Sequence, residues 1–245
     1  MHVFQKKWGQ NFLYDLNTAK KIISFLELSS NENVLEIGPG DGALTKILVQ
    51  KAKKVYAVEI DSRLVQILND LNFSNLNIIN NDILKDDLYR YPETIKIVGN
   101  LPYYIASTII IKLLKYNKWT SMLFMVQKEV GERIVADFGN KDYGRLSVMC
   151  QVFSSPIKKM DVSKRVFFPT PKIDSSIILF KPRLSIPVDQ FDEFSEFIKL
   201  AFRHRRKKIK NNLTCFYKDG LLNELSDLRP EQITPRQYIN LFGSK

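Results

Sequence analysis

The sequence is poor in the residues that build disulfide scaffolds and histidine-based metal sites. Only two cysteines and two histidines occur among 245 residues. Cys150 and Cys215 lie far apart, with no CxxC spacing. Disulfide frameworks and zinc sites need several such residues at short spacings. We therefore expect reduced, packed cysteines and no metal ion.

Long apolar runs are missing as well. No stretch approaches the roughly 18 consecutive apolar residues of a membrane-spanning helix. The first ten residues, MHVFQKKWGQ, lack the apolar core of a signal peptide. The sequence thus predicts a soluble, cytoplasmic protein with no membrane partner.

Acidic residues are scarce relative to basic ones. There are 26 Asp and Glu residues against 37 Lys and Arg, which gives a formal net charge of +11. Such an imbalance attracts polyanions, so nucleic acid is the leading partner. With 44% apolar residues, the chain can also bury a proper core.

What the sequence does contain is an alternation of short apolar runs and amphipathic segments. This pattern predicts a doubly wound, mostly parallel α/β sheet that is covered on both faces. A first helix is expected in residues 15–28, behind the possible caps Asp15 and Asn17. The strands are expected at 33–38, 54–60, 76–82, 95–100 and 121–127, with helices between them at 43–52, 63–71, 107–116 and 130–138. Two further strands, antiparallel at the sheet edge, are expected at 151–162 and 174–182.

The pattern changes near residue 185. Residues 188–202 carry a helical stripe of phenylalanines, and a last helix is expected to begin at Pro235 with Thr234 as its N-cap. We therefore expect a large domain over 1–184 and a small all-helical domain over 185–245.

A glycine loop joins the strand expected at 33–38 to the helix expected at 43–52. Gly38 and Gly40 stand in VLEIGPGDGALTKIL, where a tight turn and a close ligand need residues without Cβ. Glu59 and Asp82 end the next two expected strands. Acids at the carboxyl ends of parallel strands meet at one sheet edge, so they can hold the ribose and adenine of one nucleoside.

The loop alone leaves the cofactor open. It satisfies the G-x-G-x-x-A dinucleotide fingerprint, with Glu59 about twenty residues further on. Glu36, on the strand before the glycines, and Asp82 favour S-adenosylmethionine instead. Together they resemble the E-x-G-x-G-x-G loop of class I methyltransferases, and Glu36 would then lie near the methionine amino group.

The stretch GNLPYYIAS, residues 99–107, carries a second motif. Asn-Leu-Pro-Tyr at 100–103 is similar to the (N/D/S)-P-P-(Y/F) motif of enzymes that methylate exocyclic amino nitrogens. The chain as a whole resembles the bacterial small-subunit ribosomal RNA adenine N6,N6-dimethyltransferases. The resemblance extends over seven blocks in the family's order, at 6–13, 34–45, 98–107, 125–136, 143–151, 167–177 and 201–213.

This resemblance implies an enzyme that uses S-adenosylmethionine and dimethylates N6 of two adjacent adenosines in the 3′-terminal hairpin loop of 16S rRNA. Its partner would be 16S rRNA in the small ribosomal subunit or its precursor, with a role in subunit biogenesis. Residues 1–184 would be the catalytic, cofactor-binding domain and 185–245 the RNA-binding domain. We expect a monomer.

The motif offers a chemical reason for its residues. An adenine N6 lone pair is delocalised into the ring, and acceptors aimed at both amino protons favour a nucleophilic, pyramidal nitrogen. The side-chain oxygen of Asn100 and the backbone carbonyl of Leu101 or Pro102 can supply these acceptors, and proline fixes the backbone locally. Tyr103 can stack on a flipped-out base.

Three further roles follow only from the resemblance. The family's F-x-P-x-P-K block implies that Phe167 closes the opposite face of the base. The GQNFL block implies that Asn11 and Leu13, like Asn100, contact the cofactor.

A basic run in FRHRRKKIK contains no acid and is expected to contact RNA phosphates along a groove. The residues are Arg203, Arg205, Arg206, Lys207, Lys208 and Lys210. Three other hypotheses about the function stay open at this point. They are a macrolide-resistance type 23S rRNA adenine N6-methyltransferase, a non-catalytic nucleic-acid-binding assembly factor, and a dehydrogenase that binds NAD.

Overall fold

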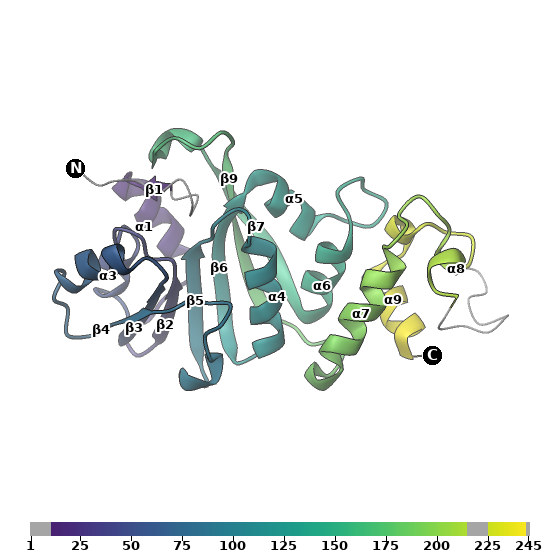
Figure 1. Ribbon diagram of the computed structural model, residues 1–245, viewed down its shortest axis with the longest axis horizontal. Helices are drawn as coiled ribbons and strands as arrows, with labels where there is room; N and C mark the ends of the chain where they lie inside the picture. Colours follow the sequence, from purple (N-terminus) through teal and green to yellow (C-terminus); the bar gives the residue numbers. More distant parts are fainter. Residues whose placement is uncertain (1–10, 215–224, 244–245) are drawn as a thin grey trace. The chain divides into compact units, whose positions relative to one another are not determined.

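The computed structural model describes residues 11–214 and 225–243 (Figure 1). The chain divides into two compact units, one of residues 1–131 and 157–181 and another of residues 132–156 and 182–245. A single boundary after residue 184 therefore misplaces 132–156. The helix in that stretch packs its apolar side chains among the C-terminal helices, which a linear reading of the sequence cannot reveal.

The first unit is built on a sheet with strand order β4-β3-β2-β5-β6-β9-β7. Its strands are β2 Asn33–Ile37, β3 Lys54–Glu59, β4 Leu76–Asn80, β5 Ile95–Asn100, β6 Trp119–Gln127, β7 Ser154–Val162 and β9 Ser175–Pro182. The first five pair in parallel, and β9 runs antiparallel to β6. The expected doubly wound sheet with an antiparallel edge is confirmed. Strand order reverses between β2 and β5, and ligands of such sheets bind at that reversal.

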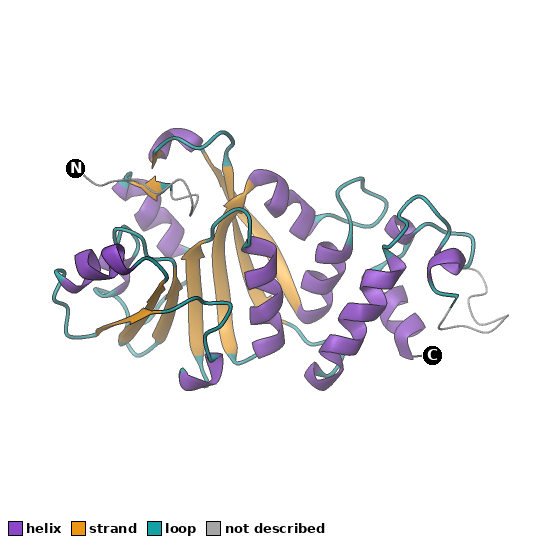
Figure 2. Ribbon diagram, viewed as in Figure 1, coloured by secondary structure: helices purple, strands orange, loops and turns teal. Residues whose placement is uncertain are grey.

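Helices cover both faces of this sheet. They are α1 Leu16–Ser24, α2 Thr45–Leu48, α3 Ser62–Asn69, α4 Ala106–Tyr116 and, at the unit boundary, α5 Lys128–Val135, with a 3-10 turn at Leu88–Arg90. Asp15 caps α1 by accepting from the Thr18 N–H at 2.7 Å. Val34, Val98 and Leu123 form a core with α1 and α2. Alternate residues point to the opposite face, and Figure 2 shows α4 lying along the sheet.

A two-stranded antiparallel sheet stands apart from the main one. It pairs β1, Phe12–Leu13, with β8, Phe167–Phe168, which follows a 3-10 turn at Lys164–Val166. The sequence did not predict it, because two-residue strands carry no periodicity. This pairing brings the start of the described chain next to a segment more than 150 residues away.

The second unit, over its described residues, contains helices joined by turns. These are α6 Arg145–Phe153, α7 Phe191–Ala201, α8 Ile209–Asn212 and α9 Pro235–Gly243, with 3-10 turns at Val188–Gln190 and Pro230–Gln232. Aromatic rings join them, since the Phe153 centroid lies 4.5 Å from that of Phe191. The expected strand start at 151 is wrong, because residues 151–153 end α6. The expected N-cap is confirmed: Thr234 Oγ1 accepts the Gln237 N–H at 3.2 Å.

Candidate active site

The glycine loop after β2 turns in a conformation that side chains rarely adopt. Gly38 and Gly40 have φ values of +65° and +62°. The Gly38 N–H donates to the Val58 carbonyl at 2.9 Å, which ties the loop to β3. A Cβ at Gly40 would come within 3.2 Å of the Phe12 ring. The loop therefore lies close under residue 12 and exposes backbone rather than side chains.

Glu36 lies one residue before the end of β2 and is almost wholly buried, at 1% exposed. Its Oε2 accepts a hydrogen bond from Thr45 Oγ1 at 2.7 Å. Burial raises the pKa of Glu36 to about 8. The carboxyl is thus protonated in much of the free protein at neutral pH, and a cationic ligand group would favour its ionised form.

Glu59 ends β3 and binds the glycine loop directly. Its Oε2 accepts the Gly40 N–H at 3.2 Å, and its Oε1 accepts the Asp61 N–H at 2.9 Å. Burial raises the pKa of this carboxyl above its ordinary value. These two backbone bonds fix the direction of the carboxylate, whose remaining lone pairs can accept from ribose hydroxyls.

Asp82 lies in the loop after β4. Its Oδ1 accepts the Leu84 N–H at 2.9 Å. Within residues 11–214 and 225–243, its second oxygen accepts no hydrogen bond. A free carboxylate oxygen at this edge can accept from an amino group of a bound base.

The Asn100 motif begins where β5 ends. The Asn100 Nδ2 donates to the Asn11 carbonyl at 3.1 Å, so its Oδ1 is left as an acceptor. The Leu101 N–H donates to the Met125 carbonyl at 3.0 Å, and the Pro102 carbonyl accepts the Ile105 N–H at 3.2 Å. Main-chain bonds on both sides of the turn therefore hold the motif.

Tyr103 is positioned through its hydroxyl. Its Oη lies 3.1 Å from Ser175 Oγ, at the start of β9. Burial raises the pKa of Tyr103, so the hydroxyl stays neutral at physiological pH. The ring is thus anchored from the sheet side. The neighbouring Tyr104 is 61% exposed.

These residues line one cleft, which is partly open to solvent and lies at the carboxyl ends of the parallel strands. The cleft brings together all the expected cofactor residues and the four residues of the Asn100 motif. They are Asn11, Leu13, Glu36, Gly38, Gly40, Glu59, Asp82, Asn100, Leu101, Pro102 and Tyr103. Sequence reasoning gave no role to Tyr104, Ile83 and Ile109, which also line it. Little in the sequence indicated that these residues line the cleft, since apolar residues beside a motif most often belong to the core.

Phe167 does not lie where the expected stacking role needs it. Its side chain is 1% exposed, belongs to the core cluster of α1 and α2, and does not line the cleft. The pairing of β8 with β1 sets Phe167 opposite the buried Leu13. In the same strand Phe168 is 58% exposed. Alternation along β8 thus turns Phe168 outward and Phe167 inward.

In the second unit, the basic run is less free of acids than its sequence suggests. Lys208 and Lys210 both pair with Asp227, at 2.9 and 2.8 Å. Arg205 donates to the carbonyls of residues 140 and 141 and lies 3.9 Å from Glu231. The side chains without an ion pair among the described residues are Arg203, Arg206 and Lys207, all exposed.

Metal-binding clusters and membrane-spanning helices are both absent from the part of the chain that the structure describes. Among residues 11–214 and 225–243, no cluster of three His, Cys, Asp or Glu side chains could hold a metal ion. Over the same residues, no helix is long and apolar enough to cross a membrane.

Known proteins are similar to this chain over most of its length. The family model described as ribosomal RNA adenine dimethylase matches residues 1–240. A curated relative from Aster yellows witches'-broom phytoplasma, named ribosomal RNA small subunit methyltransferase A, is 44% identical over 221 residues, covering 87% of this chain and 82% of the relative. One of the same name from Malacoplasma penetrans is 39% identical over 245 residues, covering 96% and 90%.

Two solved structures resemble the fold closely. A dimethyladenosine transferase from Plasmodium falciparum has a TM-score of 0.83 and 26% identity, covering 94% of this chain and 95% of that one. The 23S rRNA methyltransferase ErmE has a TM-score of 0.76 and 28% identity, covering 95% and 98%. Both matches include the cleft and the helical unit.

Proposed function

The chain belongs to the ribosomal RNA adenine dimethylase family, and from this membership we propose how its cleft works and which RNA it takes. It is an S-adenosylmethionine-dependent enzyme that dimethylates adenine in ribosomal RNA. This assignment excludes the interpretation of the chain as a dehydrogenase that binds NAD. The main support for the proposed site is that the Asn100 motif lines the same cleft as the carboxyl groups of Glu36, Glu59 and Asp82.

We assign the cofactor to the acidic side of the cleft. Glu59 would accept from the ribose hydroxyls, and the free oxygen of Asp82 would accept from the adenine amino group. Glu36 would lie near the methionine amino group. The glycine loop and residues 11 and 13 would pack around the remainder. The residues present thus fit S-adenosylmethionine, which supplies an electrophilic sulfonium methyl when bound.

We assign the target base to the Asn100 side. Asn100 Oδ1 would accept one N6 proton of the flipped-out adenine, because its Nδ2 is already held by the Asn11 carbonyl. The second acceptor would be the backbone carbonyl of Leu101 or Pro102, and the Pro102 carbonyl already uses one of its two lone pairs for the Ile105 N–H. Preorganised acceptors of this kind stabilise charge that develops at the nitrogen in the transition state.

Tyr103 would stack on the base, and its bond to Ser175 keeps the ring in place before the RNA arrives. Phe167 is not assigned the opposite face, because its side chain is buried in the core. The exposed ring of Tyr104 would contact a neighbouring nucleotide instead.

We propose 16S rRNA in the small ribosomal subunit or its precursor as the substrate, with two adjacent adenosines in the 3′-terminal hairpin loop as targets. The names of relatives at 39–44% identity support this choice over 23S rRNA, which the name of the 28% identical ErmE specifies. Binding of phosphates by Arg203, Arg206 and Lys207 would contribute RNA affinity. A cytoplasmic monomer with a part in subunit assembly completes the proposal.

The test is incubation with labelled S-adenosylmethionine and undermethylated 30S particles, followed by mapping of the modified bases. Naked 23S rRNA serves as the competing substrate, and Asn100→Ala serves as the control that lacks the proposed acceptor. Label on two adjacent adenines of the 3′ hairpin supports the proposal. Label on 23S rRNA alone would replace it with the resistance-type activity, and binding without label would indicate a non-catalytic factor.

A further inference from the structure

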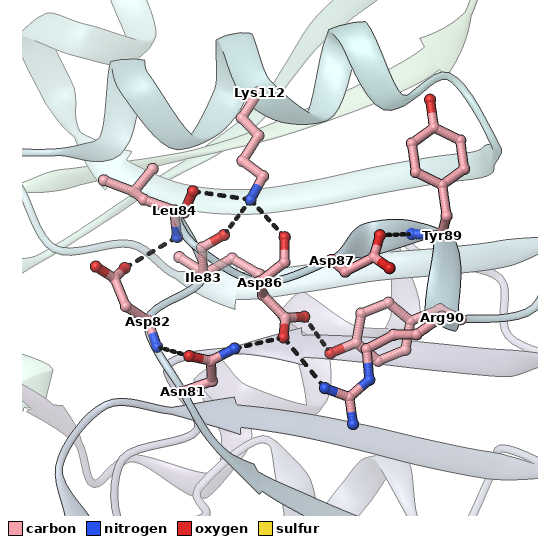
Figure 3. A network of polar contacts seen from close by, with 10 residues as sticks. Asn81, Asp82, Ile83, Leu84, Asp86, Asp87, Tyr89, Arg90 and Lys112 are labelled. Carbon is pink, nitrogen blue, oxygen red and sulfur yellow. Dashed lines mark hydrogen bonds and ion pairs between the residues drawn. The ribbon is translucent and has the colours of Figure 1, made fainter.

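Lys112 extends from the second turn of α4 to the loop that follows β4 (Figure 3). Its Nζ donates to the main-chain carbonyls of Ile83, Leu84 and Asp86 at 2.8, 2.9 and 2.7 Å. An ammonium group has three protons, and each of them has a carbonyl here. The full donor capacity of one side chain is therefore used on a single short loop.

The same loop is held from its other side by Asp86, which is 3% exposed. Its carboxylate accepts from Asn81 Nδ2 at 2.7 Å and from Tyr91 Oη at 2.5 Å. Asn81 in turn accepts the Asp82 N–H at 2.9 Å, as Figure 3 shows. The chain on both sides of Asp82 is thus fixed by side chains that do not line the cleft.

What this loop presents to the cleft is Asp82 and Ile83. The helix that holds it, α4, begins directly after the Asn100 motif, and Ile109 of this helix also lines the cleft. Lys112 lies three residues beyond Ile109 on the same helix. One side chain therefore connects the helix that follows the methyl-acceptor motif to the loop proposed to read the cofactor's adenine.

We infer that Lys112 is a positioning residue for adenine recognition: by holding the carbonyls of residues 83, 84 and 86, it sets the place of the free Asp82 oxygen. The inference deepens the proposed function and rests on its assignment of Asp82 to the cofactor amino group. Lys112 itself touches no cofactor atom in this arrangement. Its effect passes through the main chain of the loop and through its positive charge, which interacts with the carboxylates of Asp86, Asp82 and Asp87.

The test compares two ligands that differ at the purine edge Asp82 would read. S-adenosylhomocysteine carries an amino group at C6 and no proton on N1, whereas S-inosylhomocysteine carries an oxygen at C6 and a proton on N1. The wild-type chain should bind the adenine ligand about tenfold more tightly, as a hydrogen bond to a charged acceptor implies. Titration calorimetry gives both affinities.

Lys112→Met removes the ammonium and keeps the length of the side chain. The variant should bind S-adenosylhomocysteine about tenfold more weakly, whereas its affinity for S-inosylhomocysteine stays within about twofold. The preference for adenine is then nearly lost. The KM for S-adenosylmethionine should rise in parallel, with kcat at saturation and the KM for 30S particles unchanged. Lys115→Met, an exposed lysine of the same helix, is the matched control and should keep the preference.

An equal loss for both ligands would mean that Lys112 only supports the fold, and an unchanged preference would overturn the inference. A wild-type chain with no preference for adenine would overturn it too, although methylation of 30S particles would still uphold the proposed function. If Lys112→Met does not fold, Lys112→Gln keeps one shorter donor and serves in its place. Hydrogen exchange at residues 83–88 of that variant should then be faster than in wild type, and unchanged exchange would count against the inference.

Discussion

Asn100 Nδ2 lies 3.1 Å from the main-chain carbonyl oxygen of Asn11. This bond decides which way the carboxamide points, because the donor end faces residue 11 and the acceptor end is left for a substrate. The partner is a backbone atom, so no side-chain substitution at residue 11 removes it. The proposed catalytic orientation therefore depends on the path of the chain just before β1.

Replacing Asn100 by alanine should lower kcat about 100- to 1000-fold, the range seen when one preorganised polar group is removed from a transition state. The affinity for S-adenosylhomocysteine should fall much less. Single-turnover methylation of 30S particles and calorimetry measure the two effects. Asn100→Asp should also be impaired, because its carboxylate would face the Asn11 carbonyl oxygen instead of donating to it. Full turnover by Asn100→Ala would contradict the site.

Tyr103 should act through its ring first and its hydroxyl second. Tyr103→Ala should lose about 10- to 100-fold in kcat/KM for RNA, as expected for a stacking interaction of about 1–3 kcal/mol. Tyr103→Phe keeps the ring and should lose less. Because Oη contacts Ser175, the double variant with Ser175→Ala should be no worse than either single variant. Additive losses would show that the hydroxyl acts elsewhere.

Glu36 should make cofactor binding depend on pH. The pKa of about 8 in the free protein should fall when a cationic amino group binds nearby, so binding at pH 7 should release a proton. Affinity should therefore rise as the pH increases toward 8. Calorimetry in buffers of different ionisation enthalpy counts the protons. Glu36→Gln should abolish the release, and a wild type that releases none would remove Glu36 from the cofactor's amino end.

The same raised pKa also affects stability. Unfolded Glu36 ionises near its ordinary value of 4.5, whereas the folded group holds its proton until about pH 8. The contribution of Glu36 to stability is therefore present at low pH and is lost as the pH rises through 8. Urea titrations between pH 5 and 9 should show a steeper decline for wild type than for Glu36→Gln.

The RNA surface can be tested without disturbing the fold. Arg206→Glu with Lys207→Glu should weaken RNA binding and lower the slope of log affinity against log salt by about two, one unit per lost phosphate contact. Lys20→Glu with Lys21→Glu changes the net charge equally and should leave the slope nearly unchanged. Arg205 is a poor choice for this test, because it holds the carbonyls of residues 140 and 141. An unchanged slope in the first variant would remove these two residues from the interface.

Gly131 in α5 allows a prediction about stability. A Cβ there would lie 2.7 Å from Ser176 Cβ on β9, so alanine forces the helix away from the sheet. Gly131→Ala should cost about 1–3 kcal/mol despite the better helix propensity of alanine. Gly243→Ala, in α9 and with nothing within 4 Å of a Cβ, is the control. Thermal unfolding compares them, and equal midpoints would contradict the prediction.

The sheet could be predicted because its strands are short apolar runs between amphipathic helices, and the expected strand at 95–100 coincides with β5. The cofactor acids followed from the rule that parallel strands end at one edge. Their roles remain predictions. The inward direction of Phe167 could not be foreseen, since it depends on pairing with a strand of two residues.

Two other features could not be predicted from the sequence, for a different reason. Asp227 pairs with both Lys208 and Lys210 from 17 to 19 residues further along the chain, so the absence of acids within the run did not predict its ion pairs. The partners of Lys112 are all main-chain carbonyls, which every residue possesses, so no residue type reveals them. Sequence patterns identify side chains that recur at a spacing. They do not identify a side chain whose partners are the backbone carbonyls of a loop.

The arrangement of α4 has a consequence for selectivity. The proposed reaction brings two copies of the same purine into one cleft, one in the methyl donor and one in the RNA. A carboxylate after β4 would read the first and a carboxamide after β5 the second. The helix α4 starts just after the Asn100 motif, and its Lys112 holds the loop that carries Asp82. The positions of the Asn100 carboxamide and the Asp82 carboxylate are therefore coupled. Free adenosine carries the same purine and should therefore compete with the donor and with the RNA for these two places.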